Sequence, residues 1–235
     1  MASAVKRGAD VAREALPEEA ARTPGVPVKT RTEPVEIARS LSEEILKGYD
    51  FLFVGLDPAG MPEGGFNPDI SVSAHSFGGP LAVAIARGAH KRDPIGGPLR
   101  LLVPITGDPT SRRGAEVAIE LARASRAEFT VLFLSPAASA RSSVSERRRR
   151  ALTRRNEEAA IKEVVALADH RDQAARVKSK RSHDWPAAIL EEADAANASL
   201  IVLGVAVRPS EALLFGETAK RLLETSSRSL LFAAS

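Results

Sequence analysis

The amino-acid sequence predicts an α/β fold, a doubly wound parallel sheet with helices on both faces. Short apolar runs typical of buried strands alternate with helical patterns from residue 98 onward, which is the order of a parallel sheet. Of the 235 residues, 44% are hydrophobic and 27% charged, as in folded globular chains rather than disordered ones. No apolar run approaches the ~18 residues that a membrane-spanning helix needs.

The first half of this region reads as strand, helix, strand, helix. The runs Leu99–Ile105 (LRLLVPI) and Glu128–Leu134 (EFTVLFL) are mostly apolar, as expected of strands that are buried on both faces. Between them, residues 111–125 place apolar side chains at helical spacing. Residues 146–170 predict a longer helix whose apolar face lies in its second half.

The second half continues the alternation. Arg176–Lys180 is a short polar strand, expected near an edge of the sheet. Asp184 and Pro186 are residue types favoured at the N-cap and in the first turn, which predicts a helix over residues 185–196. The remaining elements are a strand at 199–205, a helix at 215–224 and a last strand at 229–233.

The N-terminal part of the chain repeats the later part at an offset of 149 residues. The matching segments are Val28–Arg31 with Val177–Lys180, Phe51–Gly55 with Leu200–Gly204, Phe66 with Phe215, and Pro80–Ala86 with Ser229–Ser235. We therefore expect a complete unit over residues 98–235, a linker over 89–97, and a truncated unit over 1–88. The truncated unit lacks the first strand, first helix and second strand of the complete one.

These segments resemble a known family. The complete unit is similar to a universal stress protein domain, which implies a Rossmann-like fold; LVPI, SRRGAEVAIELA, VLFL and the stretch from Leu200 to Phe232 carry the resemblance. The tandem further resembles the cytoplasmic C-terminal region of bacterial cation/proton antiporters, through GYDFLFVG, PEGGF, GGPLAVAIARG, LVPITG and LLFGETA. That resemblance implies a regulatory module at the cytoplasmic face of the inner membrane, attached to a transporter.

Many members of the family bind ATP through a Gly-x2-Gly-x9-Gly-Ser/Thr loop and an Asp at the end of the first strand. In this chain the loop is altered, because Val207 stands at the second glycine position and Glu217 where Ser is common. Valine prevents close approach of the backbone to a phosphate, and glutamate adds like charge. The candidate cleft comprises Ile105, Thr106, Gly107, Asp108, Phe133, Gly204, Val205, Val207, Arg208, Gly216, Glu217 and Thr218.

Three interpretations of this cleft remain open. Gly204 and Gly216 can be glycines that the fold needs at a turn and a helix entry, without any ligand. The cleft can bind ATP or another adenine nucleotide, or it can bind a different small anion. In the truncated unit Asn67 and Pro68 replace the phosphate-binding pattern, so no nucleotide is expected there. The last strand of each unit, at Pro80–Ala86 and Ser229–Ala233, is expected to pair within the chain or in a homo-oligomer.

Basic charge is concentrated in one segment. Residues 141–155 hold seven Arg and one Glu, so the formal charge of the rest of the chain is negative although the total is +3. The Arg147–Arg155 segment is interpreted as a solvated helix start, with anionic lipid as the functional alternative. Nucleic acid is disfavoured because aromatic residues make up only 4% of the chain.

Other chemistries find little support. The chain has no cysteine, which excludes disulfides and thiol catalysis, and its four histidines show no metal-ligand spacing. The segment Ala74–Gly79 resembles a nucleophile elbow, but it begins with Ala and precedes a strand rather than a helix. We therefore expect no enzyme and no metal site. The expected function is a cytosolic regulatory module for ligand sensing and dimerisation, and the alternative is a stand-alone ATP-binding universal stress protein.

Overall fold

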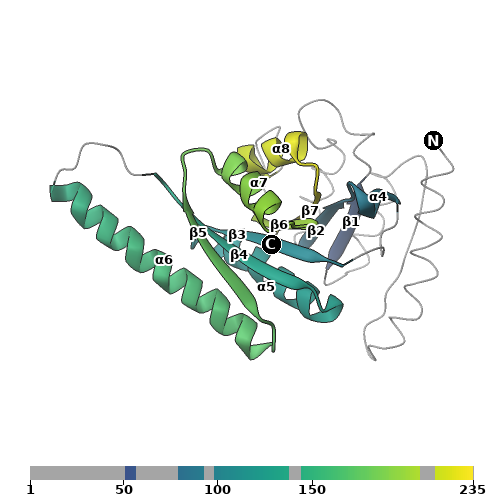
Figure 1. Ribbon diagram of the computed structural model, residues 1–235, viewed down its shortest axis with the longest axis horizontal. Helices are drawn as coiled ribbons and strands as arrows, with labels where there is room; N and C mark the ends of the chain where they lie inside the picture. Colours follow the sequence, from purple (N-terminus) through teal and green to yellow (C-terminus); the bar gives the residue numbers. More distant parts are fainter. Residues whose placement is uncertain (1–50, 57–78, 93–97, 138–143, 207–214, 235) are drawn as a thin grey trace.

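A single mixed sheet organises the chain. The computed structural model describes residues 51–56, 79–92, 98–137, 144–206 and 215–234. Seven strands form one sheet in the order β1-β2-β7-β6-β3-β4-β5, and helices cover both of its faces (Figure 1). Every neighbouring pair is parallel except β2 and β7, which are antiparallel. The predicted α/β class is confirmed.

The strands and helices other than α4 lie within two residues of the predicted ones. They are β1 (Leu52–Leu56), β2 (Leu81–Ile85), α4 (Ala89–Arg92), β3 (Arg100–Ile105), α5 (Pro109–Ser125), β4 (Glu128–Ser135), α6 (Val144–His170), β5 (Ala175–Arg181), α7 (Trp185–Ala195), β6 (Leu200–Val205), α8 (Gly216–Thr225) and β7 (Ser229–Ala234). The largest differences concern α5 and α6, which both begin two residues early. The short helix α4 lies within the segment expected to be a linker.

Two hydrophobic layers lie on opposite faces of the sheet. Leu132 and Leu134 of β4 join the layer with α7 and α8, whereas Phe129, Val131 and Phe133 join the layer with α5 and α6. Because both faces are covered, the central strands are apolar at nearly every position. β5 carries polar side chains and is an edge strand, as predicted.

The β2–β7 pair joins the N-terminal strands to the rest of the sheet. Val83 lies opposite Phe232, which is the residue 149 positions further along the chain. In the parallel pairs β1–β2 and β6–β7, each residue has its partner 29 positions further on in both cases. These pairings are the ones that a local two-fold axis between β2 and β7 would produce among the four strands β1-β2-β7-β6. Val28–Arg31 and Phe66, which also entered the repeat, lie outside the described residues.

Arg87, which follows β2, connects that strand to helix α8 by hydrogen bonds. Its guanidinium donates hydrogen bonds to the carbonyl oxygens of Leu223 and Ser226, in the last turn and at the C-cap of α8. Its backbone N–H donates to the Ser229 hydroxyl at 3.0 Å, and that hydroxyl is 2.9 Å from Nδ1 of His90. A cation at these carbonyls also suits the negative end of the helix dipole.

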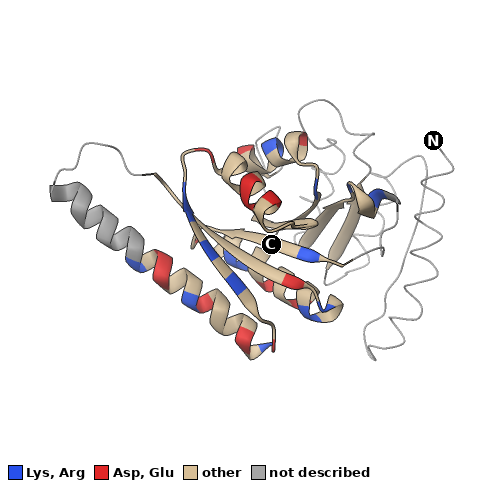
Figure 2. Ribbon diagram, viewed as in Figure 1, with Lys and Arg blue, Asp and Glu red and all other residues tan. Residues whose placement is uncertain are grey.

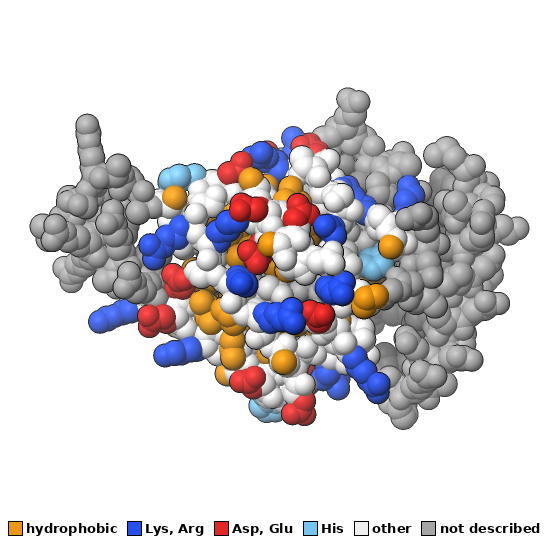
Figure 3. All heavy atoms as spheres, viewed as in Figure 1, with side chains coloured by type: hydrophobic (Ala, Val, Ile, Leu, Met, Phe, Trp, Pro, Cys, Tyr) orange, Lys and Arg blue, Asp and Glu red, His pale blue; other side chains and the backbone are white. Residues whose placement is uncertain are grey.

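Charges are mixed over the described surface. Acidic and basic side chains both occur along α5 and the described part of α6, the charged residues of α7 are all acidic, and β5 is basic (Figure 2). In the space-filling view both signs are interspersed on the visible face (Figure 3). Among the described helices, none has the combination of length and low polarity that crossing a bilayer requires.

Candidate functional site

The N-terminus of α5 organises the loop that follows β3. Asp108 is the N-cap of α5, and its Oδ1 accepts a hydrogen bond from the Ser111 N–H at 2.9 Å. The hydroxyl of Thr106 donates to Oδ2 of the same carboxylate. The Ser111 hydroxyl donates to the Asp108 carbonyl at 2.9 Å and accepts from the Thr106 N–H at 3.2 Å. This network fixes the loop and engages both oxygens of the carboxylate.

These hydrogen bonds keep Asp108 ionised. Partial burial acts to raise the pKa of Asp108, but the hydrogen bonds from Thr106, from the backbone of Ser111 and Thr110, and from the Ser111 hydroxyl outweigh it, and the pKa falls below its ordinary value. A lowered pKa in the folded state means that the carboxylate stabilises the fold above its unfolded-state pKa. That stabilisation is lost as the pH falls through the folded-state pKa.

We expect Asp108→Ala to lower the free energy of unfolding by about 1 kcal/mol at neutral pH, because the α5 N-terminus loses its cap. The difference between wild type and variant should shrink as the pH falls below about 4, the ordinary pKa of an aspartate, and through the lower folded-state pKa of Asp108. Urea unfolding at pH 7 and pH 3 measures both values. A difference that is the same at the two pH values would contradict the role of the ionised cap.

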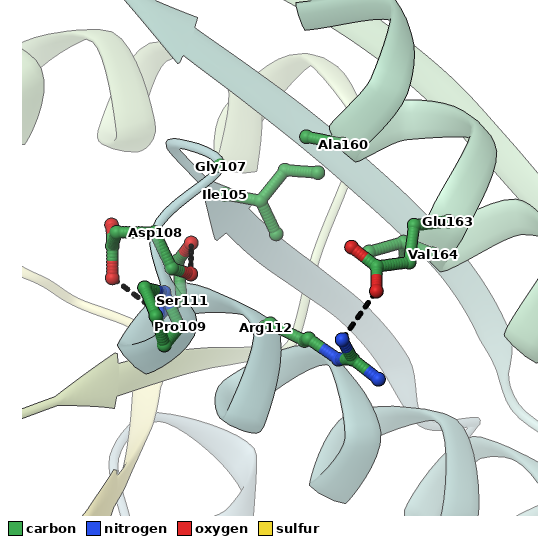
Figure 4. A pocket seen from close by; sticks show the side chains of 9 residues that line it. All are labelled: Ile105, Gly107, Asp108, Pro109, Ser111, Arg112, Ala160, Glu163 and Val164. Atoms are coloured by element: carbon green, nitrogen blue, oxygen red, sulfur yellow. Dashed lines mark hydrogen bonds and ion pairs between the residues drawn. The ribbon is translucent and has the colours of Figure 1, made fainter. Parts of the chain in front are cut away.

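A pocket of about 150 Å³ opens beside this loop, between β3, the first turn of α5 and helix α6 (Figure 4). It is lined by Ile105, Gly107, Asp108, Pro109, Ser111, Arg112, Ala160, Glu163 and Val164. The guanidinium of Arg112 forms an ion pair with Glu163 on α6 and another, at 3.1 Å, with Glu116 on its own helix. Arg112 and Glu163 are each about half exposed, so this pair is accessible to a ligand from solvent.

Gly107 shapes one wall of the pocket. Its φ of +84° lies in the left-handed region, which favours glycine. A Cβ built on Gly107 would lie 3.3 Å from Cβ of Ala160 and 3.8 Å from the ring of Phe133. Phe133 itself is 2% exposed and supports the pocket from behind.

Gly204 serves helix packing. A Cβ built on Gly204 would overlap the carbonyl oxygen of Thr110 and would lie 2.9 Å from the backbone nitrogen of Gly114. A Cβ built on Gly114 would in turn lie 2.7 Å from Cα of Gly204. The two glycines let α5 touch the backbone of β6. Helix α5 therefore occupies the space above Gly204, and the pocket lies between α5 and α6.

The start of α8 holds the remaining described candidates. Gly216 has a φ of +83°, which favours glycine at this helix entry, and Phe215 before it makes no side-chain cap hydrogen bond. Glu217 in the first turn is exposed, Thr218 is half-buried, and Val205 at the end of β6 is 4% exposed. Val207 and Arg208 lie outside the described residues.

The structure thus separates the predicted cleft into two parts. Ile105, Gly107 and Asp108 line the pocket, and Thr106 and Phe133 support it. Gly204 packs against α5, and Gly216, Glu217 and Thr218 belong to α8. Sequence reasoning missed the other lining residues, which are Pro109, Ser111, Arg112, Ala160, Glu163 and Val164. Arg112 could have been found from its place one turn after Asp108, but the α6 residues have no local signal.

The other sequence motifs lie mostly outside the described residues. Within the described part of the chain, no group of three or more His, Asp or Glu residues could hold a metal ion. The Ala74–Gly78 part of the elbow-like segment lies outside the described residues, as do the side chains from Arg147 to Arg154. Arg155 is exposed on α6.

Comparisons with known proteins agree with this fold. The family model described as "Universal stress protein family" matches residues 99–233. A protein of Pseudomonas aeruginosa UCBPP-PA14 assigned to the universal stress proteins is 18% identical, with a TM-score of 0.56 over 96% of this chain and 76% of that chain. A universal stress protein of Archaeoglobus fulgidus DSM 4304 is 14% identical, with a TM-score of 0.53 over 97% and 79% of the two chains.

A further solved structure covers a smaller share of the chain. It is the universal stress protein of Archaeoglobus fulgidus in complex with dAMP, which is 16% identical with a TM-score of 0.43, over 59% of this chain and 98% of that chain. The comparison with curated proteins found no match. Because the family model covers more than half of its residues, the chain belongs to the universal stress protein family.

Proposed function

We propose that the chain is a regulatory module that binds a small anionic ligand in the pocket between α5 and α6, with an adenine nucleotide as the first candidate. One observation carries the proposal: the pocket lies beyond the carboxyl end of the parallel strand β3, which is one of the two strands that flank the switch point of the sheet. Ligands of open α/β sheets bind at such switch points.

The charges at the pocket favour an anion that competes for Arg112. That guanidinium is held by Glu163 and Glu116, two partly exposed carboxylates whose attraction for it is screened by water. A phosphate could replace one of them and accept two parallel hydrogen bonds from the planar guanidinium. The ionised Asp108 is engaged as a helix cap, so its repulsion of the ligand is moderated by its own hydrogen bonds.

The proposed regulatory role belongs to a cation/proton antiporter, at the cytoplasmic face of the inner membrane. The sequence resemblance described above supports this assignment, which includes no catalytic step. Ligand binding would act through differential affinity for two packings of the N-terminal strand pair against the rest of the sheet. The β2–β7 pair and Arg87, which connect the two parts, support this route.

We expect calorimetric titration with ATP, ADP, AMP and cyclic dinucleotides to detect saturable binding of at least one of them. Arg112→Gln should weaken that binding about fivefold to tenfold, because one charge-assisted contact is lost. Glu163→Gln should strengthen it about twofold to fivefold, because the competing carboxylate is neutralised. Arg123→Gln, on the last turn of the same helix and paired with Glu120, is the matched control.

The outcome separates the proposal from its alternative. A stand-alone ATP-binding protein requires tight binding of the triphosphate in preference to AMP, although Glu217 lies in the first turn of α8. Selective ATP binding that Arg112→Gln leaves unchanged would favour this alternative and place the ligand at α8. Absence of binding by every nucleotide tested would overturn the nucleotide assignment.

A further inference from the structure

The two edge strands of the sheet, β5 and β1, differ in how well their side chains prevent pairing with another chain. The β5 edge carries Arg176, Lys178, Lys180 and Arg181, and such basic side chains keep an edge strand from pairing with other chains. The β1 edge has the sequence LFVGL, without charge or proline. Phe51 just before it and Phe53 within it are 45% and 61% exposed. Among the described residues, no strand lies beside the outer edge of β1.

Strand β6 is the equivalent of β1 at the offset of 149 residues, and its neighbours show which elements can cover a face of this kind. At the offset of 149 residues, Phe53 corresponds to Val202, which is 0% exposed in the layer covered by α5. Phe53 points to the same side of the sheet, because its neighbour Val54 belongs to the opposite layer. The outer edge of β6 is paired in parallel with β3 at Leu101 and Leu102.

The most specific evidence that a helix can pack on this face is a glycine, Gly55, with no described atom where its side chain would lie. Gly55 corresponds to Gly204, whose lack of a side chain is required by the backbone of α5. A Cβ built on Gly55 would meet no atom of the described residues within 4 Å. The β1 face therefore has the two features that β6 uses for its helix, an apolar side chain and a glycine, while no described helix lies against the glycine.

We propose that β1 and this face, formed by Phe51, Phe53 and Gly55, bind a strand–helix segment of a partner polypeptide. The strand is apolar and adds parallel to β1, as β3 does to β6. The helix covers Phe53 and brings a small residue against Gly55, as Gly114 of α5 meets Gly204. This surface is the open end of the sheet beyond β2 and β7, so the partner adds to it by β-strand addition.

A second copy of this chain fits the surface less well. Pairing of β1 with β1 would satisfy the strand edge, but it would bring no helix to Gly55. The α5 of the second copy already lies against its own β6. Strand pairing alone also tolerates alanine at Gly55, whereas close approach of a helix does not. Gly55→Ala therefore distinguishes a strand–helix partner from a second copy.

The test uses the full chain and a synthetic peptide with the sequence of residues 98–126, the β3–α5 segment that fills the equivalent place. We expect saturable one-to-one binding by fluorescence anisotropy, with slower amide exchange in residues 52–55. Gly55→Ala should weaken binding tenfold or more, because its methyl group meets the helix backbone. Its thermal unfolding temperature should be unchanged or slightly higher, since the added methyl group meets none of the described residues.

Two further variants complete the design. Phe53→Lys should also abolish binding, while Val177→Lys, at the exposed hydrophobic position on the opposite edge, should leave it unchanged. Failure of the peptide to bind, or equal binding by wild type and Gly55→Ala, overturns the proposal. Sedimentation that shows a dimer broken by Phe53→Lys but kept by Gly55→Ala assigns the face to a second copy and overturns it as well. None of these readouts depends on the nucleotide pocket.

Discussion

Gly204→Ala is expected to lower the free energy of unfolding by about 3 kcal/mol, a loss at the upper end of what overpacking usually costs. The new methyl group would overlap the Thr110 carbonyl oxygen, which belongs to the backbone of α5. A flexible side chain could rotate away, but a helix backbone must move as a whole. Urea unfolding followed by circular dichroism measures the loss, and Gly114→Ala should cause a similar one from the other side of the contact.

Gly55→Ala is the matched control for this experiment. The residue type, the strand position and the substitution are the same, but a Cβ on Gly55 meets no atom within 4 Å in the part of the chain that the structure describes. We expect its free energy of unfolding to stay within about 0.5 kcal/mol of wild type or to rise, because alanine restricts the unfolded chain more than glycine does. Equal losses in Gly55→Ala and Gly204→Ala would contradict the packing role of Gly204.

The packing of Gly204 also limits where a ligand can bind. In the family's phosphate loop the first glycine allows a phosphate to approach the backbone, and Gly204 matches that position in sequence. Here α5 occupies the space above Gly204. We therefore expect ligand affinity in Gly204→Ala to change only as far as the fold itself is lost. A variant of unchanged stability that no longer binds ligand would restore the phosphate role.

Much of the fold could be predicted because its signals are local. Apolar runs marked every strand of the complete unit except the polar edge strand β5, since strands covered on both faces have few polar positions. The start of α5 was placed two residues late because its cap is Asp108, with Pro109 in the first turn, while the prediction began the helix at the first apolar spacing. The antiparallel β2–β7 register depends on contacts over about 150 residues, which no local pattern encodes.

For the pocket, the sequence predicted only the residues at and just after the end of strand β3. Ile105, Gly107 and Asp108 follow from the rule that ligands lie beyond the carboxyl ends of parallel strands. Ala160, Glu163 and Val164 come from the middle of α6, and the position of that helix over the pocket is set by packing against β4 and β5. A sequence pattern gives the apolar face of a helix, but it does not give the rotation or depth at which the helix meets a distant loop.

Phe232→Ala should cause the other large effect, a loss of about 3–5 kcal/mol in the free energy of unfolding. Phe232 is 0% exposed, lies opposite Val83 across the β2–β7 pair, and stacks on Phe215 with ring centroids 5.7 Å apart. Removing the ring leaves a cavity between the junction and the start of α8. Urea unfolding measures the total loss, and Phe232→Leu should recover most of it because the cavity is largely filled.

Phe129→Ala is the matched control, because it separates loosening of the β2–β7 junction from a general loss of stability. Phe129 is also buried, at 1% exposed, but it lies on β4 in the layer covered by α5 and α6. The two variants should lose similar total stability, whereas only Phe232→Ala should speed amide exchange in β2 and α8 under native conditions. That selective loosening is required if the N-terminal strand pair can shift against the rest of the sheet when ligand binds. Identical exchange patterns in the two variants would mean that the pair separates only on global unfolding, and the β2–β7 junction could not transmit a regulatory signal.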